Sequence, residues 1–182
     1  MIKNTTIPSH IQKVVDAIKN QNQKYFIVTL HRRENRGDKM SCLWEQINAI
    51  ASSEQYNKLK LVYITHPAIP DAKTRLNRNV ILLDPLDYAS MVHLIYHSAG
   101  IITDSGGLQE EAVCANKKIL VCRDTTERPE TIMSGHGKLI DTNLTDNFHF
   151  LTSDDLSELN ENPYGSNVCK KIVHYLASLY GL

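Results

Sequence analysis

The sequence predicts an α/β protein built on a doubly wound parallel sheet with helices on both faces. Short apolar segments typical of strands alternate with helical segments along nearly all of the 182 residues. Such alternation is typical of βαβ units, whose strands run parallel with right-handed crossovers. The content of 42% hydrophobic and 22% charged residues is that of an ordinary globular domain. We therefore expect residues 1–182 to form a single Rossmann-like domain.

The first elements along the chain are expected to be a helix, a strand, a second helix and a second strand. Residues 8–20 have apolar positions at helical spacing, whereas 25–30 form a continuous apolar run typical of a strand buried on both faces. Residues 31–39 are charged and predict a loop. The segment 41–52 has apolar residues on one helical side, and 61–65 are the next strand.

The middle of the chain continues the same alternation of strands and helices. A short helix is expected after Pro70, followed by an apolar strand at 80–83. The segment 88–97 is predicted to be helical, and 101–103 is predicted to be a strand. A helix over 105–115 then follows that strand directly.

The last third of the chain is less regular. Residues 119–122 predict a strand, 129–134 a short helix and 138–140 a final strand at the edge of the sheet. The stretch 144–165 is polar and irregular, which indicates a long surface connection. Residues 166–179 predict a last helix with apolar side chains on one side.

Composition argues against several classes of function. The formal net charge is zero, whereas a nucleic-acid binder would usually have a basic excess. No apolar stretch approaches the length of a membrane span, and residues 1–6 lack the apolar core of a signal peptide. His93 and His97 stand one helical turn apart without a third metal ligand, so no metal site is predicted. The cysteines lack zinc-ligand spacing; Cys114 and Cys122 are expected to be small core residues in a reduced, cytoplasmic protein.

A turn of small residues follows the strand at 101–103 and opens the next helix. Free N–H groups and the helix dipole favour an anion at such a turn, and Gly106 and Gly107 let a phosphate approach the backbone. Glu111 lies within about two turns of this start, near enough to accept hydrogen bonds from sugar hydroxyls. The pattern predicts a nucleoside-diphosphate site at Ser105, with a plain tight turn as the alternative.

Other polar segments also follow strands and should therefore share one rim of the sheet with this turn. His31 could donate to a phosphate or transfer a proton, and Arg32 and Arg33 could pair with phosphate or carboxylate. A solvated charged loop is the alternative. The segment 123–130 holds two arginines, three carboxylates and two hydroxyls ahead of a helix start. It is either a loop that faces a ligand or a segment whose polar groups bond to one another and cap the helix that follows.

Two further rim segments carry weaker signals. His66 precedes a proline and could line the rim or belong to a structural turn. The segment 84–88 leads into a helix, with Asp87 as its N-cap. Its backbone could bind a flat base, with Met91 covering a ring face; a capped helix start is the alternative.

Five motifs identify a family when they are taken together in their order. They are HRREN at 31–35, DPLDY at 84–88, TDSGGLQEEA at 103–112, RDTTERPE at 123–130 and NPYG at 162–165. The chain resembles the carboxyl-terminal half of bacterial non-hydrolysing UDP-N-acetylglucosamine 2-epimerases. The resemblance implies a Rossmann-like domain of the glycosyltransferase-B type, with a UDP-sugar bound between it and an amino-terminal domain.

The resemblance also implies a reaction. The proton at C2 is removed, UDP is expelled and then added back after protonation on the other face, which interconverts UDP-N-acetylglucosamine and UDP-N-acetylmannosamine. The resemblance implies that no metal or nicotinamide cofactor is required. The alternatives are a catalytically inactive fragment that binds UDP-sugar, and a hydrolysing 2-epimerase. The implied partners are UDP-N-acetylglucosamine or UDP, an amino-terminal epimerase half and a second copy in a homodimer, with no nucleic acid or membrane.

The resemblance assigns roles to individual residues. His31 would act at the phosphate region as the catalytic residue, and His66 matches a position near a second, activating UDP-sugar site. Glu111 would hold the ribose, and the segment from Asp84 to Met91 would contact uracil. The implied substrate-binding residues are Arg32, Asp84, Met91, Ser105, Gly106, Gly107, Glu111, Arg123, Thr126, Glu127 and Arg128.

The sequence also departs from the family pattern. The family's amino-terminal domain supplies the lysine and most carboxylates of the C2 chemistry, and this sequence has no counterpart of it. Ile69 stands before the second proline of the segment after His66, where the family commonly has asparagine. Ser166 and Asn167 replace the usual Asp-Gly, and Met91 replaces a common aromatic residue.

Overall fold

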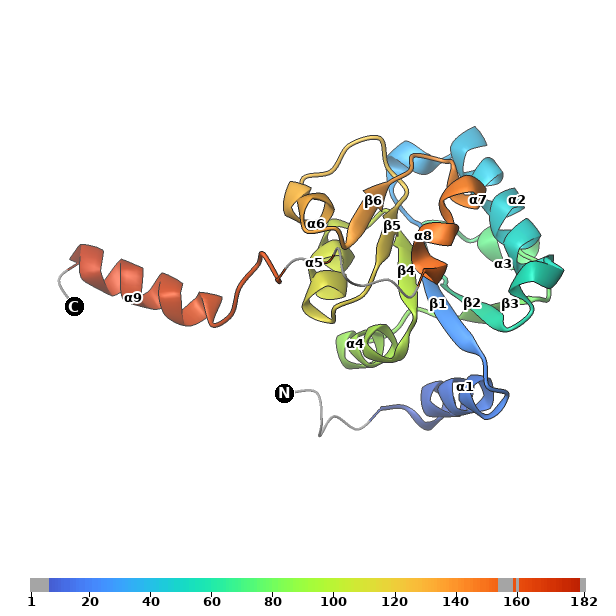
Figure 1. The fold of residues 1–182 in the computed structure, drawn as a ribbon, viewed down its shortest axis with the longest axis horizontal. Helices are drawn as coiled ribbons and strands as arrows, with labels where there is room; N and C mark the ends of the chain where they lie inside the picture. Colours follow the sequence, from blue (N-terminus) through green and yellow to red (C-terminus); the bar gives the residue numbers. More distant parts are fainter. Residues whose placement is uncertain (1–6, 154–158, 160, 181–182) are drawn as a thin grey trace.

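The computed structural model describes residues 7–153, 159 and 161–180, so the expectation for residues 1–6 lies outside the described part of the chain. The described strands form one sheet of six parallel strands in the order β3-β2-β1-β4-β5-β6. Their bounds are β1 (Lys24–Thr29), β2 (Leu59–Ile64), β3 (Val80–Leu83), β4 (Gly100–Thr103), β5 (Ile119–Val121) and β6 (Gly137–Leu139). The predicted doubly wound parallel sheet is therefore confirmed (Figure 1).

Helices follow the strands and cover both faces of the sheet (Figure 1). The α-helices are α1 (Ser9–Asn20), α2 (Asp38–Ser52), α3 (Ala72–Arg75), α4 (Tyr88–His97), α5 (Gly106–Cys114), α6 (Pro129–Met133), α7 (Leu144–Asn147), α8 (His149–Thr152) and α9 (Val168–Tyr180). Two 3-10 turns, η2 (Arg33–Asn35) and η3 (Glu54–Tyr56), lie before and after α2. The predicted bounds of β3 and α4 match those observed.

The sheet separates two apolar cores. Along β1, Phe26 and Val28 belong to one core, whereas Tyr25 and Ile27 belong to the other, because successive side chains of a strand point to opposite faces. The first core is closed by α2, α3, α7 and α8, and the second by α1, α4 and α5. Burial on both faces explains why the strands read as continuous apolar runs.

The prediction of a surface connection over residues 144–165 is wrong in its first part. Leu144, Phe148 and Leu151 are almost completely buried, and the short helices α7 and α8 hold them against the first core. Their spacing of four and then three residues is a helical pattern. It was obscured because the residues between them are mostly polar and each helix is only four residues long.

Two smaller predictions also need correction. Helix α2 begins at Asp38, not at Ser41, because Gly37 adopts a φ of 75° as its N-cap and Asp38 places a negative charge in the first turn. Cys114 is exposed, whereas Cys122 is buried as expected. Cys114 is the last residue of α5 and lies outside the core.

Helix α9 has the predicted apolar side, but that side contacts neither core. None of the described α9 residues is buried, and the helix projects away from the rest of the domain (Figure 1). Its exposed large apolar residues are Val168, Ile172, Val173, Tyr175, Leu176, Leu179 and Tyr180. Apolar surface of this extent on one helix is typical of a surface that another protein segment covers.

The stability of the fold should fall as the pH is lowered through the range where histidine titrates. His136 is buried between Ser134 and Asn116, and burial lowers its pKa below the ordinary 6.5. The unfolded chain therefore binds protons at a higher pH than the folded chain, so the free energy of unfolding decreases as the pH falls below 6.5. His31, His93 and His97 shift in the same direction, chiefly through burial.

We expect the thermal midpoint to drop by a few degrees between about pH 7.5 and pH 5.5. Circular dichroism at both values measures this drop, with His136→Gln as the comparison. The variant should lose part of the pH dependence. An equal drop in the variant and the wild type would contradict the role of His136.

Candidate active site

The site lies where the order of strands in the sheet reverses. From β1 the chain proceeds to β2 and β3 on one side of the sheet, whereas β4, β5 and β6 lie on the other side. Ligands of open parallel sheets bind in the crevice at the carboxyl ends of the strands at such a point. The loops after β1 and β4 meet there, because these two strands are neighbours.

Asp104, directly after β4, joins the loops of this crevice. Its carboxylate is completely buried and accepts hydrogen bonds from the backbone N–H groups of His31 (3.0 and 3.1 Å) and Arg32 (2.8 Å). It also accepts from the side-chain amide of Asn35 (3.0 Å), which donates in turn to the carbonyl of Cys122 (2.9 Å). A buried charge needs such donors, and these donors tie the ends of β1, β4 and β5 together.

Asp104 and Asn35 were not among the site residues predicted from the sequence. A signal for Asp104 was available, because a carboxylate directly after a buried apolar strand must find donors in the fold. Nothing in the sequence distinguished Asn35 from its charged neighbours.

His31 lies in the loop directly after β1, with its side chain 31% exposed. Its Nδ1 atom is 3.7 Å from Oδ1 of Asp104, and its ring stacks on His66 with centroids 4.7 Å apart. Burial lowers the pKa of His31; Asp104 opposes this shift, whereas His66 and Arg32 add to it. A lowered pKa favours the neutral form of the imidazole, which can accept a proton. His66 thus lies beside His31 at the rim, and its Nδ1 atom also accepts from the backbone N–H of Ala68 (3.1 Å), so the rim position and the structural turn both have support.

Helix α5 begins at this crevice with Ser105 as its N-cap. The Ser105 side chain makes no capping hydrogen bond, and its backbone N–H donates to Oγ1 of Thr103 (3.0 Å). A Cβ atom on Gly107 would face open space, whereas one on Gly106 would collide with the carboxylate of Glu127. We predicted that a ligand could approach the backbone closely at both glycines; the structure leaves that approach open at Gly107 only.

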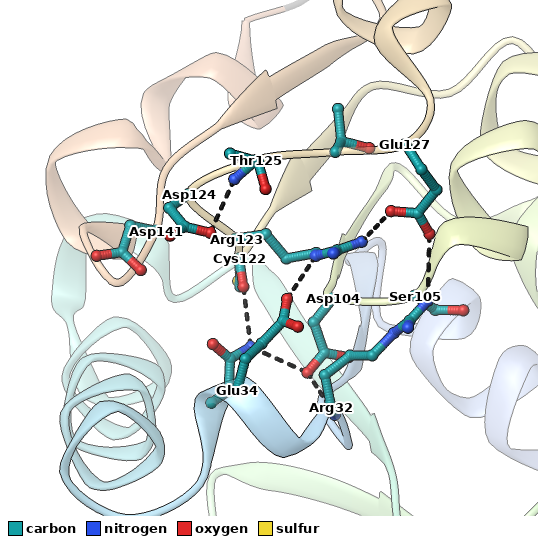
Figure 2. A network of polar contacts seen from close by, with 12 residues as sticks. Arg32, Glu34, Asp104, Ser105, Cys122, Arg123, Asp124, Thr125, Glu127 and Asp141 are labelled. Atoms are coloured by element: carbon teal, nitrogen blue, oxygen red, sulfur yellow. Dashed lines mark hydrogen bonds and ion pairs between the residues drawn. The ribbon is translucent and has the colours of Figure 1, made fainter.

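A network of charged side chains links the loops after β1 and β5 beside the start of α5 (Figure 2). Arg123, only 12% exposed, pairs with Glu34 (Nε to Oε1, 2.6 Å) and with Glu127, and Arg32 reaches Glu127 from the other side (3.3 Å). Burial acts to lower the pKa of Arg123, but its hydrogen bonds with Glu127 and Glu34 outweigh burial and raise it. Two cations are thus held beside the start of α5.

The rest of the loop after β5 is fastened to α5. Oγ1 of Thr126 donates to Gln109 (2.7 Å) and accepts from the backbone N–H of Arg128 (3.0 Å), and Arg128 pairs with Glu110. Both interpretations of the segment 123–130 therefore have support. Thr126 and Arg128 belong to a network that fixes the loop, whereas the charges of Arg123 and Glu127 lie at the crevice.

Glu111, the residue expected to bind the ribose, lies beside a cavity between α4 and α5. Glu111 lines a cavity of about 200 Å³ whose other lining residues are Tyr88, Val92, Ile95, Tyr96, Cys114 and Ala115. Burial, followed by repulsion from Glu110, raises the pKa of Glu111. A half-buried carboxylate beside apolar and aromatic side chains suits a ligand with hydroxyls on a flat body.

The two residues expected near uracil, Asp84 and Met91, lie in different surroundings. Met91 is partly buried against the second core, and Asp84 is exposed and pairs with Lys73 (2.7 Å). Asp87 caps α4 as predicted, accepting from the backbone N–H of Ser90 (2.8 Å). The roles of Asp84 and Met91 toward a base stay predictions.

Neither a cluster of potential metal ligands nor a membrane-spanning helix is found among the described residues. No group of three or more potential metal ligands occurs among them, although the rings of His93 and His97 lie 4.4 Å apart. None of the helices in the described part of the chain is long and apolar enough to span a membrane.

Comparisons with known proteins agree with the geometry. The family model described as UDP-N-acetylglucosamine 2-epimerase matches residues 2–177. The enzymes of that name from Campylobacter jejuni and Salmonella borreze are 39% and 34% identical, over 86% and 88% of this chain. The chain spans only 44% and 46% of their length.

Comparison with solved structures points to the same family. The UDP-GlcNAc 2-epimerase from Neisseria meningitidis bound to UDP-GlcNAc matches with a TM-score of 0.82 at 34% identity, covering 97% of this chain and 50% of that one. The S. aureus MnaA–UDP co-structure matches with a TM-score of 0.81 at 29% identity, covering 99% and 49%. By sequence, motif order and fold, the chain belongs to the UDP-N-acetylglucosamine 2-epimerase family.

Proposed function

We propose that this chain is the UDP-binding half of an enzyme that interconverts UDP-N-acetylglucosamine and UDP-N-acetylmannosamine. The observation that carries the proposal is the convergence of His31, two arginines and the start of α5 at the point where the strand order reverses. That combination of donors and positive charge suits a diphosphate. Residues 1–182 would act as one UDP-binding domain.

The parts of a UDP-sugar would bind to different elements. The Ser105 hydroxyl, which makes no capping hydrogen bond, and the backbone N–H group of Gly107 would hold the diphosphate together with Arg32 and Arg123. Glu111 would accept hydrogen bonds from the ribose hydroxyls beside the cavity of α4 and α5. The segment from Asp84 to Met91 would contact uracil.

His31 is the residue best placed to act in the reaction. It lies beside the proposed diphosphate site, and Asp104 fixes the backbone from which it projects. A neutral imidazole here could accept a proton or donate a hydrogen bond to the phosphate as UDP leaves. Proton removal at C2 needs a base within hydrogen-bond reach of that carbon, on the side facing away from the nucleotide.

The opposite wall of the sugar site would come from an amino-terminal half, on the same polypeptide or a separate one. The chain spans about half the length of the relatives that it matches. The exposed apolar side of α9 offers a surface on which such a half could dock. These two observations support a division of the enzyme into two parts.

Titration calorimetry with UDP tests the proposed site. The wild-type chain should bind weakly, because half a cleft leaves the ligand partly solvated, and Glu111→Ala should weaken binding at least about tenfold. Glu54→Ala, an exposed carboxylate beyond α2, is the matched control and should bind like the wild type. Absence of heat at millimolar UDP, or equal binding by the wild type and Glu111→Ala, would overturn the assignment.

A further inference from the structure

The carboxylate of Glu127 lies against Gly106, in the first turn of α5, where the helix dipole favours a negative charge. The atoms nearest to a Cβ placed on Gly106 belong to Glu127 and Arg32, and the Glu127 oxygen would collide with it. Figure 2 shows this carboxylate between the Arg123 side chain and the turn at Ser105. The space above Gly106 is therefore filled by a negatively charged group of the protein itself.

The two arginines of the site share this one carboxylate. Arg123 pairs with Oε2 of Glu127, and Nη2 of Arg32 lies 3.3 Å from Oε1. The Nε atom of Arg32 is buried and has no hydrogen-bond partner within the described part of the chain. Arg32 is thus only partly satisfied by Glu127 and retains a donor for another acceptor.

A phosphate bound at the start of α5 would need the same positive charges and the same space. Two anions cannot share that space, because the Glu127 carboxylate already fills it and like charges at close range repel. A guanidinium binds carboxylate and phosphate with the same planar donors, so one anion can replace the other.

We propose that Glu127 is an internal placeholder, which holds Arg32 and Arg123 in position and is displaced when the diphosphate binds. The inference rests on the proposed UDP site and changes the role expected for Glu127. It does not hold the substrate; it competes with the diphosphate for both arginines. Glu127 therefore lowers the affinity of the chain for diphosphate while keeping the arginines ordered.

Replacing Glu127 by the neutral isostere tests this role. Glu127→Gln should bind UDP about tenfold more tightly than the wild type, because two partly exposed ion pairs no longer have to be broken. Inorganic pyrophosphate, which lacks the nucleoside, should gain by a similar factor. Glu34→Gln is the matched control: it removes the other carboxylate from Arg123, but Glu34 is not among the atoms nearest to Gly106. Its gain should be clearly smaller.

Calorimetry on these variants and on Glu111→Ala separates the outcomes, with thermal melting as a check that each variant folds. Tighter binding of UDP and pyrophosphate by Glu127→Gln alone supports the placeholder. Unchanged or weaker binding by Glu127→Gln, or an equal gain in Glu34→Gln, overturns it while the UDP site stands. Absence of binding by every variant overturns the UDP site and the placeholder together.

Discussion

Replacing Asp104 with alanine is expected to lower the free energy of unfolding by about 3 kcal/mol and to abolish UDP binding. The backbone donors of His31 and Arg32 and the side-chain amide of Asn35 would lose their shared acceptor. Unpaired donors in a largely buried site each carry a desolvation penalty. The loop after β1 would no longer be tied to the end of β4, so His31 and Arg32 would lose their positions.

Urea denaturation measures the loss of stability. Trp44, the only tryptophan in the sequence and a buried one, provides a fluorescence signal for unfolding of the first core. Asp104→Asn keeps one acceptor oxygen and should lie between the wild type and the alanine variant. Asp124→Ala removes an exposed carboxylate in the loop after β5 and should change stability by less than about 0.5 kcal/mol. A midpoint for Asp104→Ala equal to that of Asp124→Ala would refute the central position of Asp104.

The fold could be predicted largely because the strands are buried on both faces. A continuous apolar run such as 25–30 or 80–83 is a strong signal in a short stretch of sequence. Helices α7 and α8 were missed because each has only one turn, which is too short for a periodic pattern to be clear. Their burial depends on the first core, which no local pattern reports.

The site could be predicted as a set of loops but not as a set of contacts. Parallel strands bring their carboxyl ends to one edge, so His31, His66 and Ser105 could be placed on a common rim. The pairing of Glu127 with Arg32 joins residues that are 95 positions apart. Such a pairing is decided by loop conformation, which composition does not specify. The same holds for the hydrogen bond from Asn35 to Asp104.

The isolated chain is expected not to epimerise UDP-N-acetylglucosamine. Its rim can hold a diphosphate from one side but cannot enclose the sugar, so water enters and the position of C2 is not fixed. A single imidazole at the phosphate cannot both remove a proton from one face of C2 and return a proton to the other face. Mixing the chain with the amino-terminal half of a relative, such as the Campylobacter jejuni enzyme, should restore some turnover.

In that mixture, His31→Ala should lower turnover by about a hundredfold or more, as expected for loss of a group that transfers a proton. Leu176→Glu on α9 should prevent the two halves from associating, without weakening UDP binding by the chain itself. Size-exclusion chromatography of each mixture separates failed association from failed chemistry. The Glu54→Ala chain serves as the control that should retain turnover.

The most direct test of the division of labour is solvent deuterium uptake at C2 of the sugar, followed by NMR in D₂O with UDP-N-acetylglucosamine. We expect no uptake with the 182-residue chain alone, uptake when the amino-terminal half is added, and strongly reduced uptake when the 182-residue chain in that mixture carries His31→Ala. Clear uptake by the purified chain alone would contradict this division of labour, because this domain's own residues would then suffice for the reaction.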